Sequence, residues 1–232
     1  MSLINILSRS GFFCMALTVT AFCIGTACQK KWKKAIFNPI MIGAILVILV
    51  LWWLDIPVEK YQQDCKPLTY LTTPATICLT IAFFEHLQKL KIHLPAIIIG
   101  VTGGTLSSLL SVLVLSRLFE FSNIITNSLL PKSITSAIGG PLAELIGGIP
   151  AICTAAIILT GILGNMLGPV LCKFFHFTSP VVQGVSYGSS AHVIGTAKAN
   201  EVSALTGAVS SLSLVIAGLL TAILLPILSK YF

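Results

Sequence analysis

Two polar segments interrupt an otherwise apolar chain, and they hold most of the side chains that could do chemistry. The segment SYGSSAHVIGTAKANE, residues 186–201, contains a histidine, a lysine, a glutamate and several hydroxyls. The segment SLLPKSITSAIGGPLAELIGG, residues 128–148, contains another lysine and another glutamate beside hydroxyls and glycines. Ionisable groups are costly in apolar surroundings and tend to line pathways for ions or substrates. Both segments are therefore candidates for a substrate pathway.

These side chains suit the binding of a small anion. Lys132 and Lys198 would supply positive potential, and nearby hydroxyls would donate hydrogen bonds. His192 is the candidate proton carrier because an imidazole titrates near neutral pH, and Glu144 and Glu201 are the next candidates. Two simpler interpretations stay open: each of Lys132, Lys198 and Glu201 can be an interfacial anchor, and His192 can be a buried histidine held by a backbone carbonyl. The candidate substrate-binding residues are Lys132, Ser133, Thr135, Ser136, Ser189, His192, Thr196 and Lys198.

The overall composition excludes an ordinary soluble domain. Of the 232 residues, 56% are hydrophobic and 9% are charged, whereas about 25% charged residues is usual in soluble proteins. The seven cysteines form no CxxC pair and no cysteine–histidine spacing that suits a metal. No P-loop, GxGxxG or HExxH motif is present, so we expect no cofactor. Ser190 and His192 are two residues apart and would not face each other on a helix, so we do not predict an enzyme.

Long charge-free runs predict how the polar segments are held. A bilayer crossing needs about 20 apolar residues, and several runs approach or exceed that length. We expect an all-α, polytopic transmembrane protein with seven or eight membrane segments, some broken or re-entrant, forming one domain over residues 1–232. The runs are 10–29, 35–54, 67–84, 94–116, 145–172, 174–197 and 202–229.

Proline and glycine predict where helices break. Backbone groups freed by a break need partners within a membrane, so broken helices survive only beside protein or a water-filled cavity. We expect residues 187–196 to be irregular, and helix N-termini near Ser133 and Ser189 to offer amides to an anion. Small residues at 103–111, 161–168 and 207–218 are expected instead to permit close helix packing. The expected helix-breaking residues are Pro74, Pro131, Gly188 and Gly195.

The lysines predict the orientation of the chain. KKWKK, residues 30–34, lies between the first two runs, so the positive-inside rule puts that loop in the cytoplasm and the N-terminus outside. The net charge of +7 comes mostly from such loops and forms no nucleic-acid-binding patch. A weak internal repeat relates 74–104 to 131–161, since each copy begins with proline and hydroxyls and restarts at Pro-Ala-Ile. Internal repeats of this kind build many secondary transporters.

Two long motifs make the chain resemble the LrgB/CidB family of membrane proteins. SLLPKSITSAIGGPLAELIGGIPAI is similar to that family's LPKS and IGGIPA segments, and GSSAHVIGTAKANE to its segment near the C-terminus. The resemblance extends to Asn38–Pro39, Tyr61 and Pro74–Ala75–Thr76. The chain departs from the family pattern at Ala82–Phe84, Glu144, Gln183 and Ala191.

The resemblance implies transport of small monocarboxylates such as pyruvate or glycolate across the bacterial inner membrane. It also implies a small membrane partner of the LrgA/CidA type, and a homo-oligomer is a further expectation. As an alternative function, the resemblance implies a holin- or antiholin-like regulator of murein hydrolase activity and cell lysis. Helices broken by polar motifs suit a substrate pathway better than a lytic pore, so the residues themselves favour transport.

Overall fold

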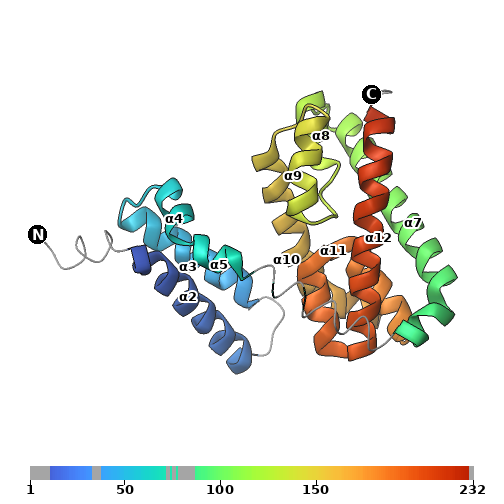
Figure 1. Ribbon diagram of the computed structural model, residues 1–232, viewed down its shortest axis with the longest axis horizontal. Coiled ribbons are helices and arrows are strands. Elements are labelled where there is room, and N and C mark those ends of the chain that lie inside the picture. Colours follow the sequence, from blue (N-terminus) through green and yellow to red (C-terminus); the bar gives the residue numbers. More distant parts are fainter. Residues whose placement is uncertain (1–10, 33–37, 72–73, 75–76, 78–86, 230–232) are drawn as a thin grey trace, which may run out of the picture. The chain divides into compact units, whose positions relative to one another are not determined.

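The computed structural model is all-helical over the residues that it describes, which confirms the expected class (Figure 1). The chain divides into two compact units, Met1–Cys78 and Leu79–Phe232, which are treated separately below. The described residues are 11–32, 38–71, 74, 77 and 87–229.

Within the described residues, four helices are long and apolar enough to cross a membrane. The expected total of seven or eight segments exceeds this number for identifiable reasons. The run 67–84 lies mostly outside the described residues, the helix at Pro39–Trp53 has only 15 residues, and the helix at Pro180–Val202 is interrupted. The four spanning candidates are Gly11–Trp32, Leu90–Leu118, Pro150–Phe174 and Ala204–Leu228.

Side-chain hydrogen bonds define the start of α3 and tie α2 to α4 in the N-terminal unit. At the start of α3 the Asn38 side chain accepts a hydrogen bond from the Ile40 amide at 2.9 Å, and Pro39 occupies the first helical position, where it needs no donor. The Thr18 hydroxyl of α2 lies 2.8 Å from the Tyr61 hydroxyl of α4. The helices of this unit are α2 (Gly11–Trp32), α3 (Pro39–Trp53), α4 (Val58–Asp64) and α5 (Lys66–Tyr70).

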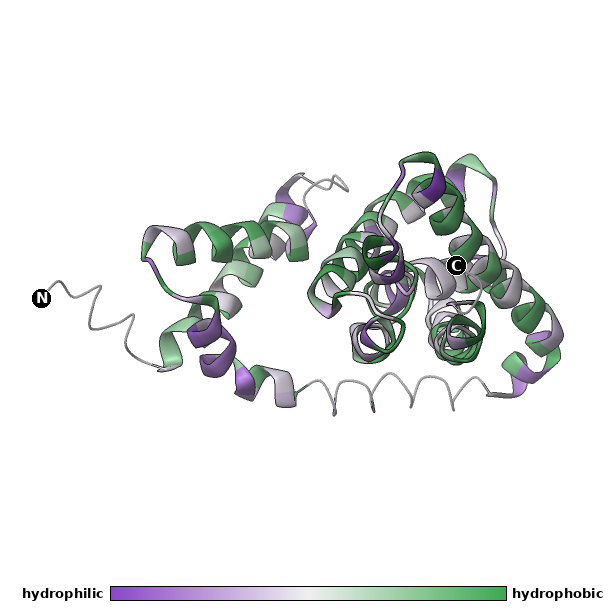
Figure 2. Cartoon of the chain, turned by 90° about the horizontal axis from the view of Figure 1, so that it is seen from above, coloured by the Kyte–Doolittle hydropathy of each residue, from purple (hydrophilic) through white to green (hydrophobic). Residues whose placement is uncertain are grey.

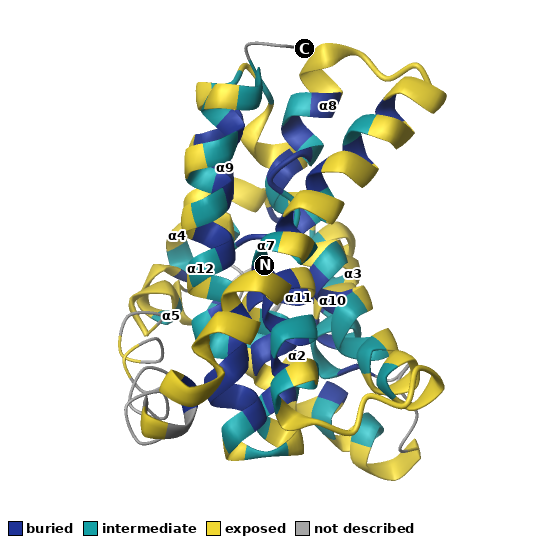
Figure 3. Cartoon of the chain, turned by 90° about the vertical axis from the view of Figure 1, so that its right-hand side faces the viewer, coloured by how far each residue is buried: buried dark blue, intermediate teal, exposed yellow. Residues whose placement is uncertain are grey.

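The C-terminal unit is a bundle in which α12 runs alongside both α7 and α11 (Figure 1). Apolar residues dominate its long helices (Figure 2), and many of them are exposed on the outside of the bundle, where lipid would cover them (Figure 3). The helices are α7 (Leu87–Leu118), α8 (Asn123–Leu129), α9 (Ser136–Leu145), α10 (Pro150–Phe174), α11 (Pro180–Val202) and α12 (Ala204–Leu228).

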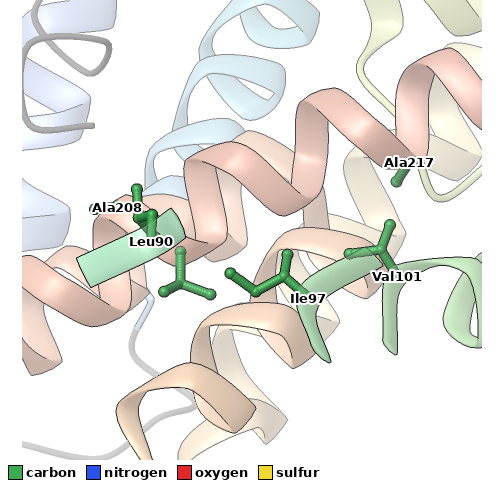
Figure 4. Close-up of a cluster of buried hydrophobic side chains, with 6 residues drawn as sticks. Leu90, Ile97, Val101, Ala208 and Ala217 are labelled. Carbon is green, nitrogen blue, oxygen red and sulfur yellow. The ribbon is translucent and has the colours of Figure 1, made fainter. Parts of the chain in front are cut away.

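A buried apolar cluster fixes α7 against α12. Leu90, Ile97 and Val101 recur at helical spacing on one face of α7, and they pack against Ala208 and Ala217 of α12 (Figure 4). The small alanines let the two backbones approach closely, which is how helices associate within lipid.

Glycines on α10 form a second packing surface, which faces α11. A Cβ atom at Gly161 would lie 2.6 Å from the His192 imidazole, and one at Gly164 would lie 2.3 Å from the Ala191 methyl. A Cβ atom at Gly168 would lie 2.3 Å from the Tyr187 ring. The packing role expected for residues 161–168 is therefore confirmed.

The helical chain is interrupted between α8 and α9. Side chains of α8 also form hydrogen bonds to the connection between α9 and α10. Pro131 lies in the turn at residues 130–134. The Asn127 amide donates to the Ile146 carbonyl at 2.6 Å, and the Ile149 amide donates to the Ser128 hydroxyl at 2.7 Å. The two contacts satisfy backbone groups at the end of α9 and the start of α10, as membrane burial requires.

The break in α11 lies at His192, which corrects the expectation that Gly188 and Gly195 mark it. His192 has φ 41° and ψ −135°, and it is the one non-helical residue inside α11. Both glycines keep helical backbone because close packing, not flexibility, requires them. A Cβ atom at Gly188 would lie 2.3 Å from the Ser210 carbonyl oxygen, and one at Gly195 would lie 2.6 Å from the Tyr187 carbonyl oxygen.

The expected repeat is not visible as repeated local structure in the described residues. Pro95 lies inside α7, whereas its counterpart Pro150 begins α10. The rest of the first copy, including the residues on both sides of Pro74, lies mostly outside the described residues.

Candidate functional site

The C-terminal unit contains a cavity of about 560 Å³ at the two breaks. One wall comes from the turn after α8, and others come from α7, α10 and the last turn of α11 before its break. Its polar lining consists of one lysine and hydroxyls, while leucines cover the α10 side. The lining residues are Gly104, Ser107, Ser108, Ser111, Lys132, Ser133, Thr160, Leu163, Gly164, Leu167, Leu171, Ser189 and Ser190.

Lys132 is the charged residue of this cavity. Its ammonium group lies 3.5 Å from the Ser108 hydroxyl and 3.4 Å from the Ser133 hydroxyl, which are long, weak hydrogen bonds. Within the described part of the chain the ammonium has no carboxylate partner. A half-buried cation without a counter-ion favours an anion in the space beside it.

The hydroxyls of the cavity fall into two chemical kinds. Ser189 and Ser190 donate their protons to carbonyls one turn earlier, Val185 and Ser186, so they offer only lone pairs to the cavity. No hydrogen bond among the described residues occupies the hydroxyls of Ser107 and Thr160, which remain able to donate. Ser108 and Ser133 share one hydrogen bond at 2.7 Å. Free donors therefore lie on α7 and α10. Ser189 and Ser190 of α11 can only accept, as can Ser111 of α7, whose hydroxyl donates to the Ser108 carbonyl at 2.7 Å.

This distribution corrects the expected amides at Ser189. Because α11 breaks at His192, Ser189 lies in the last turn of the first half-helix, where carbonyls and partial negative charge gather. Ser133 lies before Thr135, the N-cap of α9. The N-terminus expected near Ser133 is present, whereas the one expected near Ser189 is displaced to the half-helix that begins after His192.

His192 and Thr196 maintain the break itself. The His192 Nε2 atom lies 2.8 Å from the Ile157 carbonyl oxygen of α10 and is placed to donate to it. The Thr196 hydroxyl lies 3.0 Å from the His192 carbonyl and 2.8 Å from the Ser210 hydroxyl of α12. Both side chains are buried and lie outside the cavity lining. The geometry thus favours the interpretation of His192 as a buried histidine held by a carbonyl.

The remaining predicted residues do not gather at the cavity. Lys198 forms an ion pair with Glu201 at 2.6 Å, one turn along the same helix, so its charge is already compensated. Glu144 is exposed on α9, and Thr135 and Ser136 lie at the start of that helix, outside the cavity lining. The structure therefore brings together Lys132, Ser133 and Ser189 and leaves the other predicted residues outside.

Three serines of the cavity lie in the segment 103–111, for which the sequence predicts only a packing role. Gly104 does pack closely, because a Cβ atom there would lie 3.1 Å from the Ser189 hydroxyl. Ser107, Ser108 and Ser111 instead line the cavity. The signal that could have found them is their spacing: positions 104, 107, 108 and 111 share one helical face.

One catalytic-looking motif, GVSYG at residues 184–188, matches the GxSxG pattern of hydrolases. That pattern has catalytic meaning only at a sharp turn between a strand and a helix. Ser186 instead lies inside the first half of α11, and its hydroxyl donates to the Val182 carbonyl at 2.9 Å. The motif here follows from helix packing, since Gly184 and Gly188 both approach α12.

A second cavity of about 350 Å³ adjoins the first. The two share Gly164, Leu171, Ser189 and Ser190 as lining residues. The second has a more apolar, aromatic wall, which includes Tyr187, Phe175 and Phe177.

Apolar helices long enough to span a membrane, an interrupted helix and an open cavity lined by a lysine and hydroxyls together indicate a multi-pass membrane protein. The chain belongs to the LrgB-like family, whose sequence model matches residues 18–231, and the resemblance seen in the motifs is thereby confirmed. It is 28% identical to the uncharacterized protein YwbG of Bacillus subtilis (strain 168) over 221 residues, covering 95% of this chain and 98% of that protein.

Holin-like proteins are also among its relatives. The chain is 29% identical over 216 residues to the holin-like protein CidB of Staphylococcus epidermidis (strain ATCC 12228 / FDA PCI 1200), covering 93% of this chain and 94% of that protein. The same identity and coverage relate it to the holin-like protein CidB of Staphylococcus aureus (strain N315). No solved structure matches the chain.

Proposed function

We propose that the protein is a secondary transporter of small monocarboxylates of the pyruvate and glycolate type. The observation that carries the proposal is the cavity in which Lys132 has no carboxylate partner among the described residues. A carboxylate there would accept hydrogen bonds from the ammonium, and a hydroxyl or keto oxygen of the substrate would meet the free donors Ser107 and Thr160. Charge-assisted hydrogen bonds of this kind are stronger than neutral ones.

Two features of the fold support movement through this site. The cavity lies where α11 and the α8–α9 segment are interrupted, and transporters commonly build substrate sites from such discontinuous helices. The adjoining aromatic cavity continues the space past Ser189 and Ser190. We propose it as one end of the pathway.

The membrane setting forms part of the proposal. We propose seven or eight crossings in the bacterial inner membrane, with the N-terminus outside, one domain over residues 1–232, and a small LrgA/CidA-type partner or a homo-oligomer. Coupling to protons through His192, Glu144 or Glu201 remains a prediction. None of these three side chains lines the cavity.

Uptake into liposomes tests the proposal. The purified protein is reconstituted with and without the small partner, and uptake of radiolabelled pyruvate, glycolate, lactate and acetate is measured. A carrier gives saturable, stereoselective uptake with counterflow. Uptake that does not saturate and that carries dyes of similar size would contradict it.

A holin-like role is the second candidate, because the curated relatives from Staphylococcus carry that description. In the same liposomes a lytic pore releases a trapped dye without selectivity. Dye release by this chain, absent from empty liposomes, would favour the holin-like role.

A further inference from the structure

A small, hydroxyl-lined space lies next to the substrate cavity and has its own chemistry. Its volume is about 10 Å³, which is about the room that one water molecule or one small ion needs. Hydroxyls from α7, the α8–α9 turn, α11 and α12 line it together with apolar side chains, and no charged side chain does. The polar lining residues are Thr105, Ser108, Ser133, Ser189 and Thr221.

The hydroxyls around this space offer lone pairs. Ser189 donates its proton to the Val185 carbonyl at 2.7 Å, and Thr221 donates its proton to the Ala217 carbonyl at 2.7 Å. Each has only acceptor capacity left for whatever lies in the space. An occupant that they bind must be a hydrogen-bond donor or a cation, and a carboxylate is excluded.

Thr105 gives independent evidence that the space has an occupant. The residue is 4% exposed, and its hydroxyl oxygen has no hydrogen-bond partner. Unsatisfied buried polar groups are rare in native proteins and often indicate an ion or water. Thr105 lines this small space, where Ser189 and Thr221 also converge.

The break in α11 adds an electrostatic preference. Ser189 lies in the last turn before His192, so the carbonyl end of the first half-helix is beside the space. Partial negative charge at such an end favours a cation, and half-helix C-terminal ends coordinate cations in other transporters. A divalent ion would lack the carboxylates that it needs, so the ion is monovalent.

We propose that this space binds a sodium ion that is transported together with the substrate carboxylate. Lys132 contacts Ser108 and Ser133, which also line the space, so an ion there is close to the ammonium. The two like charges repel unless an anion lies between them. Sodium and the carboxylate therefore bind together, each raising the affinity for the other, as linkage requires.

This inference rests on the proposed transport function, and the experiment separates the two. Uptake of labelled pyruvate by the full-length protein in liposomes is measured at equal pH and ionic strength in sodium, potassium or choline chloride. We expect uptake in sodium to exceed uptake in choline by about tenfold or more. Thr105→Val removes the unpartnered hydroxyl at nearly constant volume and should raise the half-saturating sodium concentration about tenfold, whereas Thr105→Ser should retain sodium dependence.

A matched threonine provides the control. Thr126 of α8 is also buried and donates to a carbonyl one turn earlier, Ser122, but it lies outside both the space and the substrate cavity. Thr126→Val should leave the sodium dependence of uptake unchanged.

Equal uptake in all three salts would overturn the sodium site, assign the space to a water molecule and leave the transport proposal intact. Absence of uptake in every salt would instead overturn the transport proposal. Thermal unfolding of the purified protein then decides the ion site alone. The site is supported if sodium raises the melting temperature, potassium does not, and Thr105→Val abolishes the rise. If sodium does not raise the melting temperature, the site is overturned.

Discussion

Replacing Lys132 by alanine removes the positive charge from the cavity and tests the central contact of the proposed function. Two unit charges about 4 Å apart attract by about 4 kcal/mol at the effective dielectric constant of a protein surface. Lys132 is only partly buried, and water in an open cavity screens the pair, so we take about half of that value, about 2 kcal/mol. This loss corresponds to a rise of about 30-fold in the apparent KM for pyruvate.

The assay is initial uptake of radiolabelled pyruvate by proteoliposomes over a range of concentrations. Lys132→Arg keeps the charge and should retain part of the affinity, although a planar guanidinium will not reproduce the geometry of an ammonium. Lys198→Ala should change the KM little because Lys198 is already paired with Glu201. Lys91→Ala, which removes an exposed lysine of α7, controls for the loss of a surface charge.

Unchanged uptake kinetics in Lys132→Ala, with normal insertion and yield, would refute the reasoning. Lys132 would then be an interfacial anchor, and its position beside Ser108 and Ser133 would have no bearing on substrate. An equal loss in Lys91→Ala would also remove the case for a specific site.

Three further predictions concern the packing around the site and the role of His192. Gly161→Ala places a methyl group against the His192 imidazole and should destabilise the protein by about 1–3 kcal/mol, measured as a lower melting temperature. Gly103→Ala is the control: nothing lies within 4 Å of the added methyl group, so the melting temperature should not fall. Ser128→Ala leaves the Ile149 amide without its partner and should cost about 1–3 kcal/mol; Thr20→Ala, at an exposed hydroxyl, is its control. His192→Gln should lower stability, because it replaces the imidazole that bonds the Ile157 carbonyl. It should keep the pH profile of uptake, because the imidazole lies outside the cavity lining. A flattened pH profile would instead support the proton-carrier role.

The sequence predicts a polar site best where a residue type is compatible with few local structures. Lys132 and Ser133 follow a proline in an apolar chain, so a break with exposed polar groups was expected there, and the turn at 130–134 is present. Lys198 shows the limit of that reasoning. A lysine in an apolar chain suggests an anion site, but Glu201 lies three residues later on the same helical face, and that spacing predicts the ion pair that forms.

The position of the break in α11 could not be predicted from composition. Glycine is the residue that most readily leaves helical geometry, so Gly188 and Gly195 were the natural candidates. Whether a glycine bends or packs depends on its neighbours, and here both approach other backbone too closely for a side chain. The strained backbone of His192 is held by the Ile157 carbonyl of α10, which contacts its imidazole, and by Thr196, which bonds both the His192 carbonyl and Ser210 of α12. Ile157 and Ser210 lie far from His192 in sequence.

The polarity of α11 has a consequence for how the protein enters the membrane. Among the described helices, α10 and α12 are long and apolar enough to cross a membrane, whereas α11 between them is too polar to count as a spanning candidate. Around its break, the His192 imidazole, the Ile194 carbonyl and the Thr196 hydroxyl find their partners on those two neighbours. During synthesis α11 would therefore wait beside the translocon until α12 emerges, and the last three helices would enter the lipid as one unit. A chain that stopped before residue 204 would leave α11 without the partner that makes its insertion favourable, so the C-terminal helix acts as an assembly checkpoint for the site that it encloses.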